Sequence, residues 1–301
     1  ESDRIESRLL ATEREVAIIP SLAIHMQRDV NGGFAPNRAV DLCPLFSAGA
    51  LERGDFDALV ADELGIEPEQ ILGRDLFLVN RQDARIWGWA DEFVSTPKLD
   101  DLACAYTSLQ AFLGSSNGSD VSVFCCFDNE EVGSETKQGA ASTFLHDTLR
   151  RIAKHDLSAM LYQSFLVSAD NAHAKHPNHP ELADADNAPT LGGGVVIKYN
   201  ANQHYTTDAY SDAFFRTVCE RAGVPTQRYC NRADIRGGST LGSISDTRVS
   251  VPTVDIGLPQ LAMHAAAETA ASADLDAMIL ALTAFYSSSF TREGQKTVFN
   301  R

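Results

Sequence analysis

Four short polar motifs in this chain combine carboxylates with a histidine, the side chains that bind divalent metal ions. The motifs read KLDD, FDNEEVGS, SADNAHAKHPN and PQLAMH. They supply five candidate residues: Asp100, Glu130, Glu131, Asp170 and His264. Carboxylates that converge in a crevice repel one another, and a divalent cation offsets that repulsion. Because the ligand types are mixed, zinc, cobalt or manganese would suit such a site.

The adjacent pair Glu130 and Glu131 indicates two different roles, one as a metal ligand and one as a general base. Neighbouring side chains in an extended turn point in different directions, so one can bind a metal while the other acts as a general base. Two metals about 3.5–4 Å apart would share one carboxylate and a bridging water of lowered pKa. Taken singly, each motif also fits a helix cap, a solvated turn or a core histidine. Their order and co-occurrence favour a hydrolytic metal site.

Composition narrows the classes of partner. The chain has 301 residues, 44% hydrophobic and 22% charged, which is typical of one large or two smaller globular domains. Its formal charge of −16 argues against nucleic acid and against membrane surfaces as partners. We find no apolar run long enough to span a bilayer and no signal-peptide layout. The six cysteines lack CxxC spacing, which predicts buried, reduced thiols and a cytoplasmic location.

The elements that must position these residues follow an alternating pattern after Pro97. Apolar periodicity predicts helices over 99–113, 134–155, 207–222 and 274–287, with Ser134 as an N-cap. Short apolar runs predict strands over 121–127, 192–198 and 251–256. This alternation predicts an α/β fold with a largely parallel sheet and a ligand crevice at the carboxyl ends of its strands. Before Pro97 we expect a helix over 51–65 and a strand over 71–80.

Other hydrolase and nucleotide motifs are missing from the sequence. It contains no G-x-G-x-x-G, no Walker A motif and no G-x-S-x-G. The segment GGSTLG, which includes Gly238, fits either a tight turn or a backbone that approaches a substrate closely.

Seven motifs occur in an order that resembles the aspartyl aminopeptidase family: IPSLAIH, KLDDLA, FDNEEVGS, SADNAHAKHPN, VVIK, GGSTLG and DIGLPQLAMH. Members are cytosolic two-metal exopeptidases of the phosphorylase/hydrolase-like superfamily. The resemblance runs from about residue 18 to the C-terminus. It implies a three-layer α/β catalytic domain with a mostly parallel mixed sheet at 95–301. It also implies a smaller, β-rich inserted dimerisation domain at 1–94.

The resemblance also implies roles for individual residues. Asp100 would bridge two metals, Glu131 and His264 would complete one of them, Asp170 would bind the other, and Glu130 would be the general base. The metals would be zinc, with cobalt or manganese as alternatives.

Further positions match the family's substrate pocket. His173, Lys198 and Tyr205 would line the pocket for an acidic first side chain, because a desolvated cation pairs with a carboxylate. Gly238 would lie beside the substrate, and His25 would reach a neighbouring subunit's active site. The family's dimers assemble into dodecamers, so we expect a homo-oligomer that acts on peptides.

Two departures from the family pattern leave alternatives open. The family takes a further metal-binding histidine from an upstream segment, so the chain is expected to lack that segment and to hold the Asp100–Asp170 metal with two ligands. Arg236 and Gly237 stand where many relatives carry a Pro-Cys pair.

The leading hypothesis is a metalloaminopeptidase that removes N-terminal Asp or Glu. The alternatives are a broader, for example leucine-preferring, two-metal aminopeptidase and a non-catalytic assembly or peptide-binding protein.

Overall fold

The computed structural model describes residues 3–300 and divides the chain into two compact units that meet between Arg81 and Gln82. The described part of the first unit holds one α-helix, α1 (Asp55–Leu64), which lies inside the helix predicted over 51–65. Gly54 and Gly65 flank α1 in left-handed backbone conformations that favour glycine, so both ends of the helix are set locally.

The first unit is more irregular than the β-rich domain expected from the sequence. Besides α1 its described residues form two 3-10 turns, Val30–Gly32 and Pro68–Gln70, and one isolated bridge between Ile18 and Leu45. The strand predicted over 71–80 is wrong: in the part of the chain that the structure describes, this segment forms no strand and belongs to no sheet. A strand needs a neighbour for its backbone groups, and here the apolar side chains lie exposed.

The boundary between the units also differs from the predicted one at 94/95. Strands β1 (Arg85–Trp87) and β2 (Phe93–Thr96) form a hairpin, and β2 pairs with β9 (Glu268–Ala271) near the end of the chain. This pairing ties residues 85–96 into the second unit.

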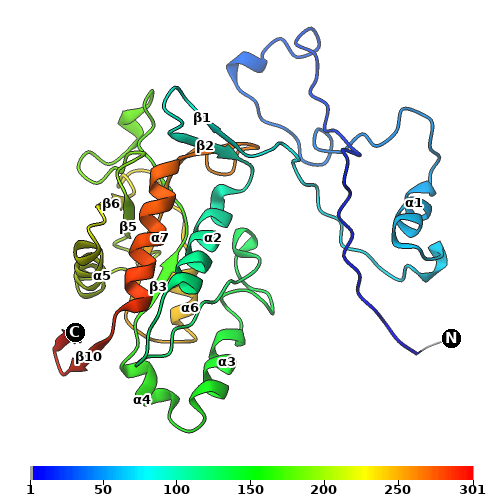
Figure 1. Cartoon of the computed structure of the whole chain (residues 1–301). Helices are drawn as coiled ribbons and strands as arrows, with labels where there is room; N and C mark the ends of the chain where they lie inside the picture. The colour runs from blue at the N-terminus through cyan, green and yellow to red at the C-terminus, as the bar shows by residue number, and fades with distance from the viewer. Residues whose placement is uncertain (1–2, 301) are drawn as a thin grey trace. The chain divides into compact units, whose positions relative to one another are not determined.

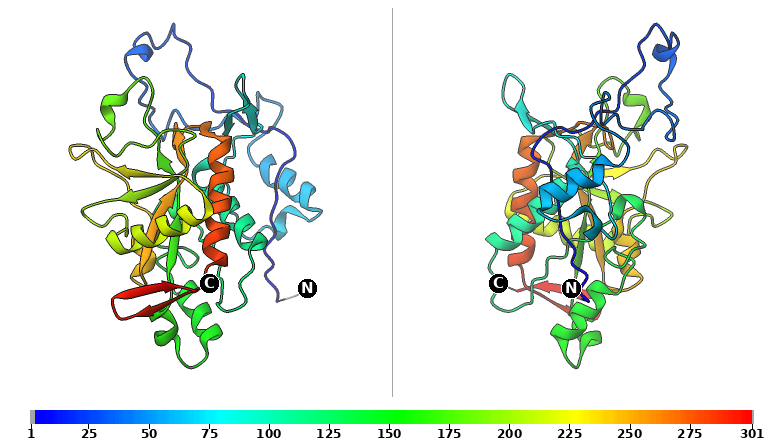
Figure 2. Two further views of the ribbon diagram at one scale, coloured as in Figure 1. Left: turned by 60° about the vertical axis from the view of Figure 1, so that its left-hand side comes forward. Right: turned by 90° about the vertical axis from the view of Figure 1, so that its right-hand side faces the viewer.

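The second unit has the three-layer α/β architecture that the sequence predicted (Figures 1 and 2). Its main sheet has the order β3-β7-β5-β6, with β3 parallel to β7, β5 parallel to β6, and β5 antiparallel to β7. The strands are Leu166–Ala169 (β3), Thr253–Gly257 (β7), Val195–Tyr199 (β5) and Thr226–Cys230 (β6). The predicted mostly parallel mixed sheet is therefore confirmed.

Helices cover both faces of this sheet. Residues of α2 (Leu99–Gly114), α5 (Ala209–Ala222) and α7 (Ser272–Ser287) join the strands in one apolar core, while α6 (Leu241–Asp246) contacts β3 and β7 from the other side. In the right-hand view of Figure 2, α7 lies to one side of the strands. Strands β5 and β7 are buried on both faces, and besides their apolar residues they bury Lys198 and Asp255.

A second sheet continues two of these strands. Its order is β1-β2-β9-β8-β4, where β4 is Ala172–His173 and β8 is Pro259–Leu261. Strand β3 leads almost directly into β4, and β7 into β8. Asp170 therefore lies at the carboxyl end of β3, where the sequence argument expected a ligand crevice.

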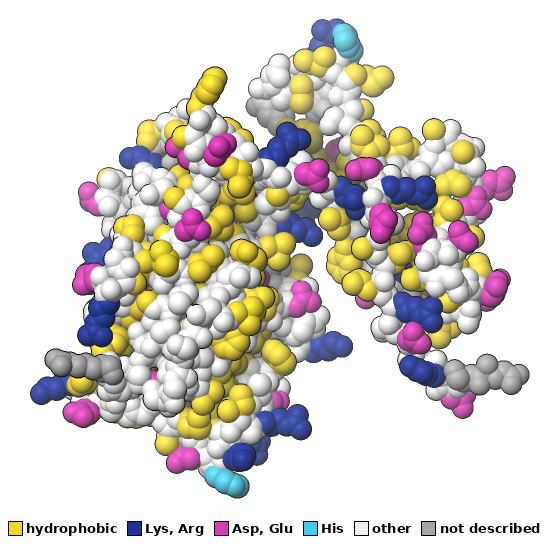
Figure 3. All heavy atoms as spheres, viewed as in Figure 1, with side chains coloured by type: hydrophobic (Ala, Val, Ile, Leu, Met, Phe, Trp, Pro, Cys, Tyr) yellow, Lys and Arg dark blue, Asp and Glu magenta, His cyan; other side chains and the backbone are white. Residues whose placement is uncertain are grey.

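Helix α2 is apolar on two faces. Its inner face reaches the core through Ala103, Cys104 and Ala111, but Leu102 and Leu113 on the outer side are 62% and 67% exposed. Figure 3 shows hydrophobic side chains gathered over α2 and α7. The apolar periodicity of α2 thus places only one of its two stripes in the core.

Two elements near the predicted site differ from expectation. The run 121–127 is extended but pairs with no strand among the described residues, so the predicted strand is wrong. Ser134 is buried with φ +61°, which an N-cap in the extended region does not have, and helix α3 (Phe144–Ala153) begins well after it. Here the tight turn around Ser134 replaces the first part of the predicted helix. The unit also contains α4 (Leu157–Tyr162) and the hairpin of β10 (Phe290–Glu293) with β11 (Lys296–Phe299).

The cysteines are all free, but they are not all buried. Cys104 and Cys219 lie in the core, whereas Cys43 and Cys126 are exposed, which corrects the prediction for those two. An apolar run without a strand partner leaves part of its surface uncovered, and Cys126 lies in such a run.

Within residues 3–300, no helix combines the length and the hydropathy needed to cross a bilayer.

Candidate metal centre

Three of the predicted ligands meet at one point of the second unit. Asp100 comes from the first turn of α2, Glu131 from a 3-10 turn (Glu130–Val132), and His264 from the turn between β8 and β9. One ligand atom from each lies within 4.8 Å of the others. The His264 Nε2 atom is 3.1 Å from Asp100 Oδ2 and 3.2 Å from Glu131 Oε2. An imidazole and two carboxylates at these distances form a donor set that suits zinc.

A second group of carboxylates adjoins the first. Oxygens of Asp100, Asp101 and Asp170 also lie within 4.8 Å of one another. The Oδ1 atoms of Asp100 and Asp101 are buried and have no hydrogen-bond partner. Since an unpartnered buried oxygen is costly, these atoms fit ligands that a cation would satisfy. Sequence reasoning missed Asp101, although the Asp-Asp pair in KLDD was visible.

The electrostatics of the cluster point the same way. Burial, together with the charges of Asp170 and Glu131, raises the pKa of Asp100 to about 8. Burial and the same two carboxylates raise the pKa of Glu130 to about 7, and burial raises the pKa of Glu131. The cluster thus holds more carboxylates than the positively charged side chains beside it can neutralise. A divalent cation would compensate the excess negative charge.

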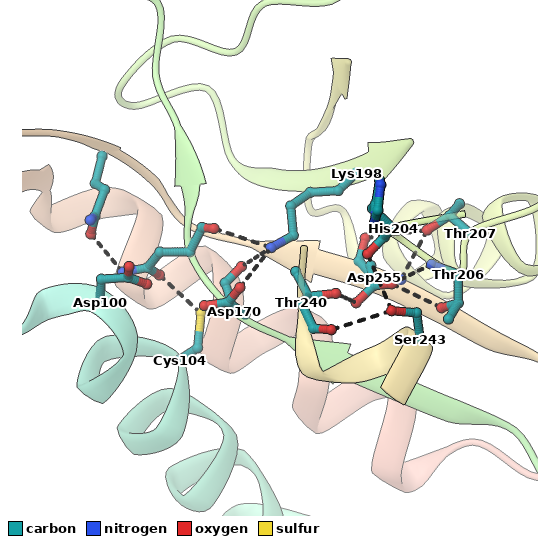
Figure 4. Close-up of polar contacts among 12 residues, drawn as sticks. Asp100, Cys104, Asp170, Lys198, His204, Thr206, Thr207, Thr240, Ser243 and Asp255 are labelled. Atoms are coloured by element: carbon teal, nitrogen blue, oxygen red, sulfur yellow. Dashed lines mark hydrogen bonds and ion pairs between the residues drawn. The ribbon is translucent and has the colours of Figure 1, made fainter. Parts of the chain in front are cut away.

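Lys198 contacts the metal-ligand candidate Asp170 (Figure 4). Its side chain is almost fully buried. The Nζ atom donates to the Asp170 carbonyl at 2.8 Å, to the Asn171 carbonyl at 3.1 Å and to Asp170 Oδ2 at 3.2 Å. Burial opposes the charged ammonium, but the Asp170 and Asp255 carboxylates raise the pKa of Lys198 above its usual value. An ammonium has three donors, and three acceptors already take them.

The remaining pocket residues lie beside Lys198. Its Nζ is 5.2 Å from the centre of the Tyr205 ring, and the rings of Tyr205 and Tyr229 are 6.2 Å apart. His173 lies 6.1 Å from Tyr229, which sequence reasoning missed because a lone tyrosine in a strand carries no signal. Gly238 is exposed and has open space where a side chain would begin. Lys198 thus lies beside the buried rings of Tyr205 and Tyr229, whereas the contact of Gly238 with a substrate stays a prediction.

His25 belongs to the first unit, in which it lies on an exposed turn. Its contribution to a neighbouring subunit stays a prediction.

Asp255 organises the segments next to Tyr205 and the glycine-rich loop (Figure 4). This fully buried carboxylate accepts hydrogen bonds from the Thr206 backbone N–H at 2.5 Å and from the hydroxyls of Thr206 and Thr240 at 2.9 and 2.8 Å. A Cβ at Gly242 would lie 2.5 Å from Asp255 Oδ1, so only glycine lets α6 approach this closely. Asp255 therefore joins the segment after Tyr205 to the glycine-rich loop, a role that the apolar run VPTVDIG concealed.

Asn171 links the metal side to α2. Its side-chain amide donates to the Leu99 carbonyl at 2.8 Å and to Gln260 Oε1 at 2.7 Å, and it accepts from the Cys104 thiol at 3.0 Å. The position of Asp170, next in the chain, is thus set by a buried polar layer.

The fold and the site together define a class: a three-layer α/β protein with a candidate hydrolytic metal centre at the carboxyl end of a strand. The family model for the aminopeptidase I zinc metalloproteases (M18) matches residues 1–286. The chain belongs to the M18 family, and the resemblance noted in its motifs is confirmed at that level.

Individual relatives agree. The chain is 43% identical over 278 residues to a probable M18 family aminopeptidase 2 of Clostridium acetobutylicum, covering 89% of the chain and 64% of that protein. It is 41% identical over 292 residues to the protein of the same name from Ectopseudomonas mendocina, covering 95% and 68%. A cryo-EM structure of the Ape4 and Nbr1 complex contains a chain that matches with a TM-score of 0.84 at 34% identity, covering 91% of this chain and 58% of that one. The chain thus spans about two thirds of the length of these relatives.

Proposed function

We propose that this chain carries the catalytic site of a metalloaminopeptidase that releases N-terminal residues from peptides. The observation that carries the proposal is the convergence of Asp100, Glu131 and His264 within 4.8 Å, next to Glu130 with its raised pKa. Membership of a zinc metalloprotease family supports it.

Two divalent cations, zinc in the first instance, fit the two overlapping donor groups. Asp100, Glu131 and His264 would hold one, and Asp100 with Asp170 would hold the other, with Asp101 as an additional oxygen donor. Asp100 belongs to both groups, which is what a bridging ligand requires. A bound cation supplies Lewis-acid chemistry toward the scissile carbonyl and toward water.

The residues of the chain would supply proton transfer and orientation. Glu130 accepts a proton from the attacking water and delivers it to the departing amine nitrogen. A pKa of about 7 suits a group that must both accept and release a proton near neutral pH, and a nearby cation would lower it. Lys198 and Asn171 hold the Asp170 segment in place.

A preference for acidic first residues is the finer proposal. Lys198, with His173 and Tyr205 beside it, would provide the positive potential that attracts a substrate carboxylate. One observation favours a broader specificity instead: the three donors of Lys198 are already taken by Asp170 and Asn171, so a substrate carboxylate would have to displace one of them.

Matched substrates test both proposals. The 301-residue chain, loaded with Zn²⁺ or Co²⁺, is assayed on Glu-, Gln- and Leu-anilides. Glu and Gln have the same shape, so their ratio of kcat/KM reports charge alone. A Glu/Gln ratio above about 10 would support the acidic preference, since a charge-assisted hydrogen bond exceeds a neutral one by about 1.4 kcal/mol or more. A ratio near unity with good Leu turnover would support broad specificity. A folded chain that binds no metal and turns over none of them would favour the non-catalytic alternative.

Assembly into dimers and dodecamers, and a cytoplasmic location, also remain proposals. The exposed side chains of Leu72 and Phe77, 82% each, support an interface on the first unit. Sedimentation of the purified chain measures the oligomeric state, and a monomer at micromolar concentration would contradict the assembly proposal.

A further inference from the structure

Glu268 is a buried carboxylate that touches two metal-ligand candidates through their backbones. It lies on β9, and 2% of its surface is exposed. Its Oε2 accepts a hydrogen bond from the Asp100 N–H at 2.8 Å, and its Oε1 accepts one from the His264 N–H at 2.6 Å. One side chain thus holds two segments that are 164 residues apart in the sequence.

Neither backbone segment is held in place by regular secondary structure. Asp100 has φ −87° and ψ 109°, which are non-helical values inside the first turn of α2. His264 has φ +65°, in the left-handed region that disfavours residues with a Cβ. A partner that binds both N–H groups offsets the cost at His264 and selects the observed conformation at both positions.

The side chains depend on those backbones to different degrees. The Asp100 carboxylate is buried, with 5% exposed, and neighbours constrain it. The His264 ring is 63% exposed, so packing constrains it little and its place follows from its backbone. Apart from the contacts of its own Nε2 with Asp100 and Glu131, the ring is therefore placed by the backbone that Glu268 holds.

We propose that Glu268 is a positioning residue that sets the spacing of Asp100 and His264 for a metal ion. This inference rests on the proposed function, because it assumes that these residues bind a cation. Bonds from backbone N–H groups to a carboxylate are charge-assisted and strong. Partners that orient metal ligands typically contribute about 10–100-fold to metal affinity.

The chain contains a matched control. Asp274, at the start of α7, is 1% exposed and also accepts two backbone N–H groups, from Gly192 at 2.8 Å and from Gly194 at 2.9 Å. The chemistry is the same as at Glu268, but neither partner is a ligand candidate. A substitution at Asp274 therefore measures how the fold in general responds when a buried carboxylate loses its bonds to two backbone N–H groups.

The experiment measures metal affinity without turnover. The parent chain, Glu268→Gln, Glu268→Asp and Asp274→Asn are titrated with Zn²⁺ against a chromophoric chelator, and the visible absorption of Co²⁺ reports ligand geometry. Circular dichroism and thermal unfolding check folding. Gln removes the charge and one acceptor, whereas Asp keeps the charge but is one methylene too short to reach both N–H groups.

We expect both Glu268 variants to bind Zn²⁺ about 10–100-fold more weakly and to change the Co²⁺ spectrum, while Asp274→Asn stays within about threefold of the parent. A folded Glu268→Asp with parental affinity and spectrum would overturn the positioning role and leave the proposed function standing. Equal weakening by Asp274→Asn would also overturn it, because the effect would then be general. If Glu268→Gln does not fold, Glu268→Asp alone decides. A folded parent that binds no metal would overturn both proposals.

Discussion

Two sets of buried acids lie in the second unit, and their surroundings differ. Asp100 and Asp101 each keep a buried Oδ1 without a hydrogen-bond partner. Asp255 and Asp274 are at least as buried, yet both oxygens of each accept hydrogen bonds from backbone N–H groups or threonine hydroxyls. Burial alone therefore does not distinguish a ligand from a structural acid. For these four residues the presence or absence of protein donors does, because a cation would have to satisfy the oxygens that no protein group contacts.

The comparison also explains how the cluster stays folded. Glu268 belongs to the satisfied set; one of its partners, Asp100, belongs to the unsatisfied set, and the other, His264, is a metal-ligand candidate. At Glu268, a satisfied acid thus holds the backbones of two ligand candidates, and Asp100 keeps an oxygen without a protein donor. The experiments below test this separation.

The largest effect is expected at Glu130. Glu130→Gln keeps the shape but cannot accept a proton, so kcat should fall about 10²–10⁴-fold on any anilide that the parent cleaves. Zinc content, measured by atomic emission, should stay at the parental level, because Glu130 is not in either donor group. Glu135→Gln, on an exposed neighbouring residue, is the control. Undiminished turnover in Glu130→Gln would remove Glu130 from its proposed role.

A smaller effect, on stability, is expected at Asp255. Asp255→Asn turns one oxygen acceptor into a donor that faces donors, so the free energy of unfolding should drop by about 2–4 kcal/mol in urea titrations. Asp234→Asn, whose carboxylate is 62% exposed and paired with Arg232, should change it by less than about 1 kcal/mol. Because Asp255 is in neither donor group, zinc affinity should stay within about threefold. Strong loss of zinc binding in Asp255→Asn would contradict the separation between acids that hold the fold and acids that bind the metal.

The smallest effect is a pH dependence that metal reverses. The pKa of Asp100 is raised from 3.8 to about 8 in the folded, metal-free chain. The folded state therefore holds a proton that the unfolded state has released, and stability falls as pH rises toward 8, by at most about 1.4 kcal/mol per pH unit for this group. Asp246, with a pKa raised to about 6, contributes only below that value, so it does not contribute to the window from pH 6.5 to 8.

Urea midpoints at both ends of this window provide the measurement. With a chelator present the midpoint should fall between pH 6.5 and pH 8. With saturating Zn²⁺ it should rise, because binding requires deprotonated ligands and releases their protons. Asp246→Asn should leave both trends unchanged. Parallel trends with and without zinc would mean that the cluster does not couple to the metal.

Much of the fold followed from local patterns. The buried runs of β5 and β7 and the periodicity of α5 are encoded within about ten residues each, and the structure contains them close to the predicted bounds. The run 121–127 has the same kind of pattern but no strand beside it. Whether an apolar run becomes a strand depends on a partner that the run itself does not contain.

The sequence by itself singled out the candidate ligands, because Asp100, Glu131, Asp170 and His264 stand in recognisable motifs at the ends of elements. Only the tertiary structure decided which acids are left without donors and which are satisfied. A lone Glu268 in AMHAAAET or Asp255 in VPTVDIG looks like any other acid in the sequence. Their roles come from hydrogen bonds to residues tens to more than a hundred positions away, and such partners exist only once the chain has folded.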